Sequence, residues 1–363
     1  MKILILANYA LGLYKFRKEL LEKLCSDNKV YIALPNGDFI DELKAIGCEF
    51  IPFEFNRRGM NPFDDLKQIV RYTDLIKKTQ PDAVLTYTIK PNVYGGVACR
   101  ITHTPYIANV TGLGTSIENG GLLGFISTSL YKIGLKKASC VFFQNESNRK
   151  LFTEKRIVCG KTRLIPGSGV NLEMHSLEEY PAEDSGIRFL FIGRVMRDKG
   201  INELLEAIQL IHEKYTNTSL DIIGGCDEDY DEKLSQACSG GFIRYHGEQK
   251  DVHSFIKNAH CTVLPSYHEG TANVILESAS AGRPVITTRV PGCKETFDEG
   301  ITGIGCDAKS VSSLVDAMER FINLSREEKA TMGLAGRKKM EREYDRNIVI
   351  NAYLEEIDNI SRS

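Results

Sequence analysis

The sequence lacks the patterns that would assign it to several common classes of protein. No Cys-x-x-Cys pair occurs among its ten cysteines, which argues against a zinc site and a disulfide framework. No hydrophobic run reaches the 18 residues of a membrane-spanning helix, and the apolar residues 1–8 are too few for a signal peptide. We therefore expect a cytosolic protein whose cysteines, such as Cys99, Cys140, Cys226 and Cys261, serve as small reduced hydrophobic residues.

The chain is long enough for two domains. It has 363 residues, of which 42% are hydrophobic and 26% are charged, so either half can bury its own core. The residues up to Arg163 include 24 Lys and Arg against 15 Asp and Glu, a balance of +9 that leaves −11 for the rest of the net charge of −2. A basic N-terminal half suits an anionic partner such as a membrane surface, although chance variation gives the same count. No nucleic-acid partner is expected.

Short apolar runs alternate with amphipathic stretches, which predicts parallel sheets covered by helices on both faces. In the first half we expect strands at residues 3–7, 30–34, 49–53, 83–87, 106–110 and 141–144. Helices are expected there at residues 16–25, 39–46, 62–77, 93–101, 122–137 and 146–154. In the second half we expect strands at residues 189–192, 220–223, 243–245, 261–264 and 285–287. Helices are expected there at residues 201–215, 229–237, 252–258, 272–281, 311–321 and 326–342.

The fold class that this pattern predicts is α/β, with two doubly wound Rossmann-like domains facing across a cleft. The Pro-Gly-Ser-Gly segment at residues 166–169 predicts the hinge. The first domain comprises residues 1–165 together with 345–363, whose helix at 347–357 we expect to return to it. The second domain comprises residues 170–344. Ligands are expected at the carboxyl ends of the strands.

The strongest chemical signal is the segment from Ser266 to Glu277, which follows an expected strand and opens an expected helix. The backbone N–H groups expected at this helix N-terminus, an anion-binding position, belong to Gly270, Thr271, Ala272 and Asn273. Glu269 stands before the helix and Glu277 two turns along it, where carboxylates can accept hydrogen bonds from sugar hydroxyls. The alternative without a binding function is that Glu269 belongs to an acidic capping turn and Glu277 is a surface glutamate.

A second signal is the segment from Gly193 to Gly200, where an expected strand gives way to a helix. Arg194 can clamp a phosphate through two hydrogen bonds, and Lys199 provides a mobile positive charge. Two solvated cations beside Asp198 are the alternative.

Together the two segments resemble the family 4 glycosyltransferases, retaining enzymes of the GT-B fold with a Glu-x7-Glu signature. The resemblance implies that Glu269 contacts the donor sugar and Glu277 the ribose, and that Arg194 and Lys199 bind the diphosphate of a UDP-sugar. Glu269, Arg194 and Lys199 are then the catalytic residues. Neither a metal nor another cofactor is expected, because these cations and the helix N-terminus meet the charge of the leaving group.

Further positions are assigned by weaker resemblance to the same family. Gly12 lies in an expected turn that could approach the donor diphosphate, where the family usually has a glycine pair. His246 and Gly247 end a strand like the uracil-reading loop of the family, although the His246 ring is better suited to packing. Thr111 and Gly112 stand on the acceptor side, where the family often has a histidine in place of Thr111.

The acceptor is expected to be a lipid-linked saccharide bound by the first domain. The stretch 122–137 combines Leu122, Phe125, Ile126, Leu130, Ile133 and Leu135 with Lys132, Lys136 and Lys137. Such a basic amphipathic helix can lie in a membrane interface, although a half-buried domain helix has the same pattern. The nearby cations that suit a polyprenyl diphosphate are Lys15, Arg17, Arg57, Arg58 and Lys90.

Short runs at residues 61–63, 111–114 and 143–148 resemble the branch that contains lipid-linked oligosaccharide N-acetylgalactosaminyltransferases and capsule and exopolysaccharide glycosyltransferases. We therefore expect transfer of a hexose or N-acetylhexosamine from a UDP-sugar to a polyprenyl-diphosphate-linked saccharide, peripherally at the inner face of the cytoplasmic membrane. A UDP-sugar 2-epimerase and a silent sugar-nucleotide binder remain as alternatives. A dinucleotide dehydrogenase is disfavoured because neither domain has a G-x-G-x-x-G after its first strand.

Overall fold

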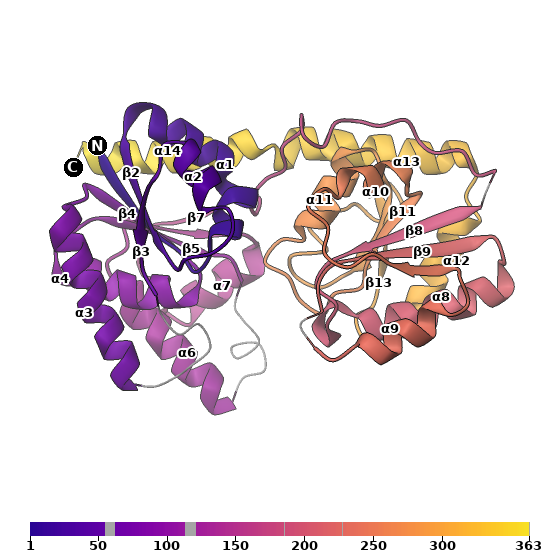
Figure 1. Cartoon of the computed structure of the whole chain (residues 1–363), viewed down its shortest axis with the longest axis horizontal. Coiled ribbons are helices and arrows are strands. Elements are labelled where there is room, and N and C mark those ends of the chain that lie inside the picture. Colours follow the sequence, from indigo (N-terminus) through magenta and orange to yellow (C-terminus); the bar gives the residue numbers. More distant parts are fainter. Residues whose placement is uncertain (55–61, 113–120, 185, 227, 363) are drawn as a thin grey trace. The chain divides into compact units, whose positions relative to one another are not determined.

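The computed structural model describes residues 1–54, 62–112, 121–184, 186–226 and 228–362. The chain divides into two compact units, one formed by Met1–Ser168 with Asn347–Ser363 and the other by Gly169–Arg346. Each unit contains its own sheet (Figure 1). The first unit is therefore discontinuous in sequence, whereas the second is a single continuous stretch.

The first unit contains a seven-stranded parallel sheet in the order β3-β2-β1-β4-β5-β6-β7. Its strands are β1 (Lys2–Leu6), β2 (Lys29–Leu34), β3 (Glu49–Pro52), β4 (Ala83–Tyr87), β5 (Tyr106–Val110), β6 (Cys140–Phe143) and β7 (Thr162–Leu164). Every residue of β4, β5 and β6 is buried, as expected for central strands covered on both faces. The direction of winding reverses between β1 and β4.

Helices cover both faces of this sheet (Figure 1). The helices on one face, whose apolar residues share a core with Ile5, are α1 (Ala10–Asp27), α2 (Ile40–Ala45) and α14 (Arg346–Ser361). The elements on the other face, whose apolar residues share a core with Leu4, are α3 (Pro62–Thr79), η1 (Pro91–Gly95), α4 (Gly96–Ile101), α6 (Gly121–Gly134) and α7 (Glu146–Glu154). None of the helices in the described part of the chain is long and apolar enough to cross a membrane.

The second unit contains a six-stranded parallel sheet in the order β10-β9-β8-β11-β12-β13. Its strands are β8 (Ile187–Ile192), β9 (Thr218–Ile223), β10 (Ile243–Tyr245), β11 (Cys261–Leu264), β12 (Val285–Thr288) and β13 (Gly303–Cys306). The winding reverses between β8 and β11, so the carboxyl ends of these two neighbours form a switch point, where α/β proteins commonly bind ligands.

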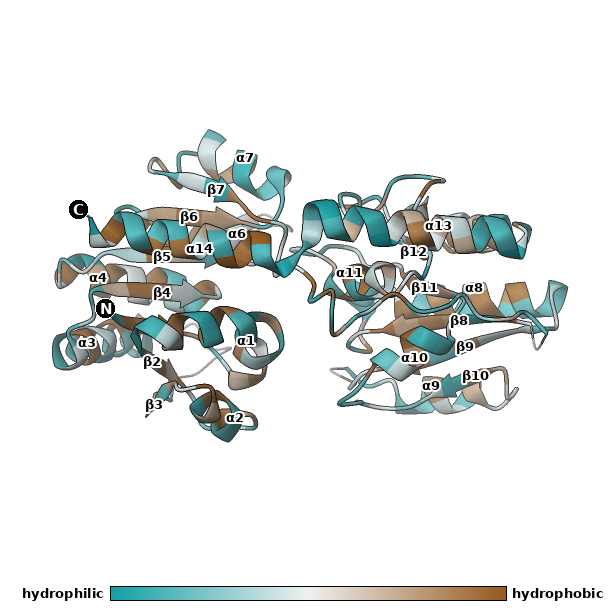
Figure 2. Ribbon diagram, turned by 90° about the horizontal axis from the view of Figure 1, so that it is seen from above, coloured by the Kyte–Doolittle hydropathy of each residue, from teal (hydrophilic) through white to brown (hydrophobic). Residues whose placement is uncertain are grey.

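The main core of the second unit lies between its sheet and the helices α8 (Ile201–Lys214), α9 (Asp231–Cys238) and α12 (Val311–Ile322). Helices α10 (His253–Asn258) and α11 (Asn273–Ser280) pack on the other side, and α13 (Arg326–Lys339) lies against α11 (Figure 1). Short turns η2 (Arg197–Lys199) and η3 (Met340–Tyr344) complete the unit. Figure 2 shows hydrophilic residues along much of α1 and α13, the pattern of helices with one face in solvent.

The two-sheet architecture is confirmed, with four local corrections. Strands β7 and β13 were not predicted, because β7 is a three-residue edge strand and β13 contains two glycines. Helix α1 begins at Ala10 and not at residue 16, so Gly12 lies in a helix and not in a flexible turn. The helix predicted at 93–101 begins in the π-helical turn η1, and the helix predicted at 326–342 ends in the π-helical turn η3. Cys226 is exposed, whereas Cys99, Cys140 and Cys261 are buried as expected.

Candidate functional site

The two chemical segments of the second domain meet at the carboxyl ends of β8 and β11, which pair in the sheet. Turn η2 follows β8, and the segment from Ser266 follows β11. The backbone N–H of Tyr267 donates to the carbonyl of Asp198 over 2.9 Å, and the Ser266 hydroxyl donates to the same carbonyl over 3.3 Å. These bonds fix the lysine-bearing turn against the glutamate-bearing loop.

Lys199 and Glu269 form an ion pair at this junction. Their side chains are 18% and 14% exposed, so water screens the pair less than it would a surface pair. Sequence reasoning placed both side chains near one ligand, and the structure brings them into direct contact. Arg194 is exposed in the connection between β8 and η2, where its guanidinium is accessible to solvent.

The loop before α11 depends on Gly292. The N–H of Ala272 donates to the carbonyl of Gly292 over 2.9 Å. Gly292 has a φ of 84°, and a Cβ there would lie 2.3 Å from the carbonyl oxygen of Glu269, so no larger residue fits. Ala272 therefore cannot offer its N–H to an anion, which corrects that part of the predicted anion site. The helix itself begins one residue later, at Asn273.

The first two turns of α11 carry Asn273 and Glu277, both half-buried. The side-chain oxygen Oδ1 of Asn273 is buried and has no hydrogen-bond partner among the described residues, although buried polar atoms are nearly always paired. Sequence reasoning assigned Asn273 only through its backbone and missed this acceptor. Thr271 is buried and Gly270 half-buried in the loop before the helix.

Cys293 lies beside this loop but is unsuited to nucleophilic chemistry. Burial, reinforced by the negative charge of Glu269, raises the pKa of the Cys293 thiol to about 12. A thiol is a poor nucleophile until it ionises. The site therefore contains carboxylates and cations as its charged groups, with a neutral thiol behind them.

The end of β10 is held by Asp221 on the neighbouring strand β9. Asp221 accepts hydrogen bonds from Arg244 over 2.8 and 3.0 Å, and its Oδ1 lies 2.7 Å from His246 Nε2. Burial favours a higher pKa for Asp221, but the hydrogen bonds from Arg244 and His246 outweigh it and hold the pKa below its ordinary value. The carboxylate is thus ionised and anchors both side chains.

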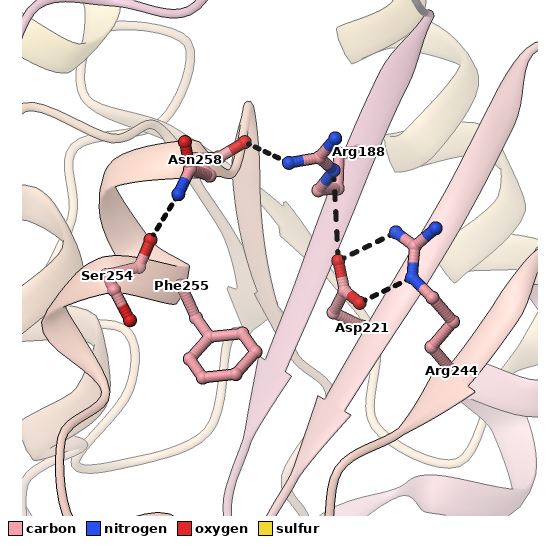
Figure 3. Close-up of a pocket in the computed structure, with 6 residues that line it drawn as sticks. All are labelled: Arg188, Asp221, Arg244, Ser254, Phe255 and Asn258. Carbon is pink, nitrogen blue, oxygen red and sulfur yellow. Dashed lines mark hydrogen bonds and ion pairs between the residues drawn. The ribbon is translucent and has the colours of Figure 1, made fainter.

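A polar pocket of about 310 Å³ lies beside this anchor, between the strands and α10 (Figure 3). Arg188 and Arg244 flank Asp221 in the figure, and Phe255 faces them from α10. Because Asp221 pairs with both guanidinium groups, we interpret this pocket as a support for β10. The His246 ring is engaged there, so its predicted donor contact would have to involve other atoms of the segment.

Gly247, the other predicted residue of this segment, contributes its backbone at the carboxyl end of the sheet. Its carbonyl accepts the N–H of Gly224 over 2.9 Å. Gly224 has a φ of 142°, and a Cβ there would lie 1.8 Å from the carbonyl oxygen of Gly193. The backbone segments that follow β8, β9 and β10 therefore approach one another closely at glycine positions, and the Tyr245 hydroxyl adds a 2.8 Å hydrogen bond to the Gly224 carbonyl.

The acceptor-side residues lie in the first unit. Thr111 is exposed and Gly112 half-buried directly after β5, at the carboxyl edge of that sheet. Lys15 is exposed on α1. Lys90, mostly buried, lies 3.8 Å from Asp65. Arg57 and Arg58 lie outside the described residues.

Arg17 is not the surface cation that the sequence indicated. It is only 4% exposed, and its guanidinium lies 5.4 Å from the ring centre of Tyr87 and 5.8 Å from that of Tyr353. Its Nη1 donates to the carbonyl of Phe16 over 2.8 Å. The alternation of charged and apolar residues at 14–18 was the misleading signal, because the helix turns Arg17 inward.

The expectation of a metal-free site remains a prediction. Within the described ranges, no group of three or more His, Cys, Asp or Glu residues is placed to hold a metal ion. The expectation also took the chain to lack an Asp-x-Asp motif, which is wrong, because Asp227, Asp229 and Asp231 form two such spacings. Asp227 lies outside the described residues.

Two family models match the chain. The model described as "Glycosyl transferase 4-like" matches residues 2–145, and the one described as "Glycosyl transferases group 1" matches residues 176–339. The second match includes the junction of η2 with the loop before α11.

Similar proteins are found among curated sequences and solved structures. An N,N'-diacetylbacillosaminyl-diphospho-undecaprenol alpha-1,3-N-acetylgalactosaminyltransferase of Campylobacter jejuni is 26% identical over the full length of both chains. A capsular polysaccharide biosynthesis glycosyltransferase, CapM, of Staphylococcus aureus is 27% identical over 95% of this chain and 93% of its own. The structure of Anabaena Alr3699/HepE with UDP and glucose has a TM-score of 0.80 at 16% identity, with both chains covered completely. The chain belongs to the family 4 glycosyltransferases, enzymes of the GT-B fold.

Proposed function

We propose that this glycosyltransferase is a retaining, metal-independent enzyme. It moves a hexose or N-acetylhexosamine from a UDP-sugar to a polyprenyl-diphosphate-linked saccharide during assembly of a bacterial surface glycan. The observation that carries this proposal is the pairing of Lys199 with Glu269 at the switch point of the second sheet. The names of the relatives from Campylobacter jejuni and Staphylococcus aureus support the acceptor class, and the complex of the Anabaena protein supports the donor class.

The proposed donor site assigns a role to each charged group. Arg194 and Lys199 bind the diphosphate, Glu277 accepts hydrogen bonds from the ribose hydroxyls, and Glu269 holds the donor sugar. Without a ligand, Lys199 is neutralised by Glu269. When the diphosphate binds, Lys199 gains a second anionic partner, so its charge is already oriented before the leaving group develops its own.

The proposed reaction breaks the bond between the anomeric carbon and the phosphate oxygen, and the bonding electrons leave with UDP. The acceptor hydroxyl attacks the oxocarbenium-like sugar from the same face, and its proton passes to the departing phosphate. Thr111 in place of the usual histidine fits this route, because a hydroxyl can orient the sugar but cannot act as an imidazole base. The configuration of the anomeric carbon is retained.

The proposed membrane contact uses α6. Phe125, Ile126 and Ile133 are 71%, 38% and 49% exposed, and Lys132, Lys136 and Lys137 are exposed nearby. Exposed apolar side chains flanked by cations suit the boundary of an anionic bilayer. Leu135 on the same stretch is buried, and the side chain of Leu122 lies outside the described residues. This surface supports a peripheral location on the inner face of the cytoplasmic membrane.

The proposal is tested with a panel of UDP-hexoses and UDP-N-acetylhexosamines and a short prenyl-diphosphate disaccharide, measuring UDP release and product stereochemistry. We expect acceptor-dependent release and an α-linked product from an α-linked donor, unchanged by EDTA. Inversion of the anomeric configuration would overturn the retaining mechanism, and a requirement for added metal would overturn metal independence. A change in the donor sugar without acceptor would support the 2-epimerase alternative instead.

Variants at the ion pair localise the activity. Lys199→Met and Glu269→Gln should each lower kcat about 100-fold or more, because a preorganised charge at the reacting centre is lost. Lys309→Met removes a lysine that lies over the Tyr267 ring and is the matched control, with kcat within about threefold of the parent. Near-normal turnover of both ion-pair variants would remove the assigned roles.

A further inference from the structure

Two thiols of the first unit, which do not belong to the proposed donor site, lie next to each other. The sulfur atoms of Cys25 and Cys48 are 3.7 Å apart, although the residues are 23 positions apart in sequence. Cys25 lies near the end of α1, and Cys48 lies just before β3. Both cysteines are free thiols.

The backbone around Cys48 holds its thiol in place. The N–H of Cys48 donates to the carbonyl of Leu43 over 3.2 Å, and the N–H of Gly47 donates to that of Lys44 over 2.9 Å. This pair of bonds is the Schellman motif that ends a helix, with glycine at the left-handed position. Gly47 has a φ of 112°, and a Cβ there would lie 3.3 Å from Cys25 Cβ. The end of α2 is therefore packed directly against Cys25.

The two thiols differ in access and in acidity. Cys25 is partly exposed, whereas Cys48 is 4% exposed and belongs to the core that contains Leu24 and Leu43. A hydrogen bond with Cys48 lowers the pKa of Cys25 despite its partial burial. The same hydrogen bond, together with burial, raises the pKa of Cys48. Cys25 is thus the thiol that ionises and meets a solute first, and Cys48 is the protected neighbour.

We propose that Cys25 and Cys48 form a dithiol modification site that a hydroperoxide oxidises to a disulfide. The Cys25 thiolate attacks the O–O bond, an alcohol or water leaves, and the Cys25 sulfur becomes a sulfenic acid. The Cys48 sulfur then attacks it, a water molecule leaves, and the S–S bond forms. Two electrons pass from the two thiols to the peroxide, which is reduced to an alcohol and water.

The position of the pair indicates that the modification leaves glycosyl transfer intact. Helix α1 follows the carboxyl end of β1 and runs to the start of β2, and Cys48 stands at the start of β3. Both thiols therefore lie at the amino edge of the first sheet, opposite the edge at which Thr111 follows β5. The disulfide would join α1 to the end of α2 and restrain the segment between them in the unfolded chain.

The test uses the full chain, treated with hydrogen peroxide at neutral pH, alkylated and digested without reduction, with peptides identified by mass spectrometry. We expect one cross-linked species that contains Cys25 and Cys48 and disappears on reduction. In Cys48→Ser, Cys25 should accumulate as a dimedone adduct. In Cys25→Ser, Cys48 should remain reduced. Cys159→Ser, which alters an exposed thiol, should cross-link like the parent.

The proposal is overturned if Cys25 and Cys48 are recovered reduced while Cys159 or Cys226 is oxidised, or if Cys25 pairs with another cysteine. Where circular dichroism shows that Cys48→Ser is not folded, Cys48→Ala replaces it in the same assay. The readout is the cross-linked peptide and not UDP release, so it is independent of the proposed function. Oxidised and reduced protein should have UDP-release rates within about twofold of each other if that function holds.

Discussion

Single residues at the carboxyl edge of the second sheet determine how the site is held. Gly224 and Gly292 allow backbone segments to approach so closely that any side chain would overlap a carbonyl oxygen. Asp221 plays the complementary role, because its charge holds Arg244 and His246 from one strand away. Backbone proximity therefore positions the loops, and one buried carboxylate fixes the side chains behind them.

Asp221→Asn should lower the free energy of unfolding by about 1–3 kcal/mol, the usual effect of leaving buried hydrogen-bonding groups unsatisfied. Because Asp221 supports the segment containing Gly247, the KM for the UDP-sugar should rise more than kcat falls. Urea unfolding and initial-rate kinetics measure the two effects. Asp316→Asn, at an exposed position of α12, is the control and should change neither quantity. Equal effects of the two substitutions would contradict the supporting role of Asp221.

At the scale of elements, ion pairs attach the last helix to the edge of the first sheet. Lys161 directly precedes β7 and Arg163 lies within it. Their side-chain nitrogens are 2.7 and 2.9 Å, respectively, from the Glu356 carboxylate on α14. Glu356 is only 4% exposed at its side chain, whereas Glu355 beside it is 62% exposed and pairs with Arg163. The two adjacent glutamates therefore provide a buried and an exposed version of the same contact.

Glu356→Gln should lower the free energy of unfolding by about 1–3 kcal/mol, because two cations lose a charged partner in a largely buried position. Glu355→Gln should cost at most about 1 kcal/mol, as is usual for exposed ion pairs. Chemical denaturation of both variants, followed by circular dichroism, gives the comparison. A cost at Glu355 that matches or exceeds the cost at Glu356 would show that burial does not govern this contact.

A buried histidine, which contacts the connector before β8, makes the stability of the fold depend on pH. His260 Nδ1 accepts the N–H of Arg188 over 3.0 Å, and Nε2 lies 3.0 Å from the carbonyl of Ala182, to which it can donate. Burial lowers the pKa of His260 below the ordinary value of 6.5. The folded state therefore binds fewer protons than the unfolded state in this range, so the contribution to stability is complete above pH 6.5 and is lost as the pH falls below it.

Urea unfolding at pH 7.5 and 5.5 should show this loss in the parent protein. His260→Asn should be less stable than the parent at pH 7.5, with a smaller decrease on acidification, because the titrating group is absent. His103→Asn, at an exposed position of the first unit, should keep the pH dependence of the parent. A parent-like slope in His260→Asn would assign the dependence to other groups.

Hydrophobic periodicity was sufficient to predict most elements, and its failures have physical causes. β11 was predicted to the residue, because all four of its residues, three of them apolar, are buried. β7 escaped prediction because an edge strand needs no apolar run. Within the site, the nearness of Lys199 to Glu269 followed from two strand ends in one sheet. The unpaired Asn273 Oδ1 and the contact between Ala272 and Gly292 depend on side-chain packing and on a distant loop, which sequence spacing does not encode.

At the scale of the whole molecule, the distribution of charge distinguishes the two units. The basic N-terminal half carries α6, on which Phe125 is 71% exposed. Single exposed apolar residues are normal in proteins, but here three of them share one helix with an adjacent lysine cluster. This combination is the basis for proposing that the first unit contacts an anionic bilayer.

Phe125→Asp should weaken binding to vesicles of phosphatidylglycerol and phosphatidylethanolamine about tenfold, because an apolar side chain at the interface is replaced by a charge of the same sign as the lipid. Leu210→Asp, an equally drastic change at a 45% exposed position of α8 in the second unit, is the control. Co-sedimentation at two salt concentrations provides the measurement. Parent-like binding of Phe125→Asp would exclude this face of α6 from the membrane contact.

The discontinuity of the first unit has a consequence for biosynthesis. Val349, Tyr353 and Ile357 of α14 are buried against the first sheet together with residues such as Ile3 and Leu34, which emerge from the ribosome more than 300 positions earlier. Until this helix is translated, only α1 and α2 cover that side of the N-terminal sheet and part of it is exposed, whereas the second unit is already complete. Domains usually fold in the order of their synthesis, but here the later one can finish first. Nascent chains that stall before residue 347 would expose an apolar sheet surface and become clients of chaperones.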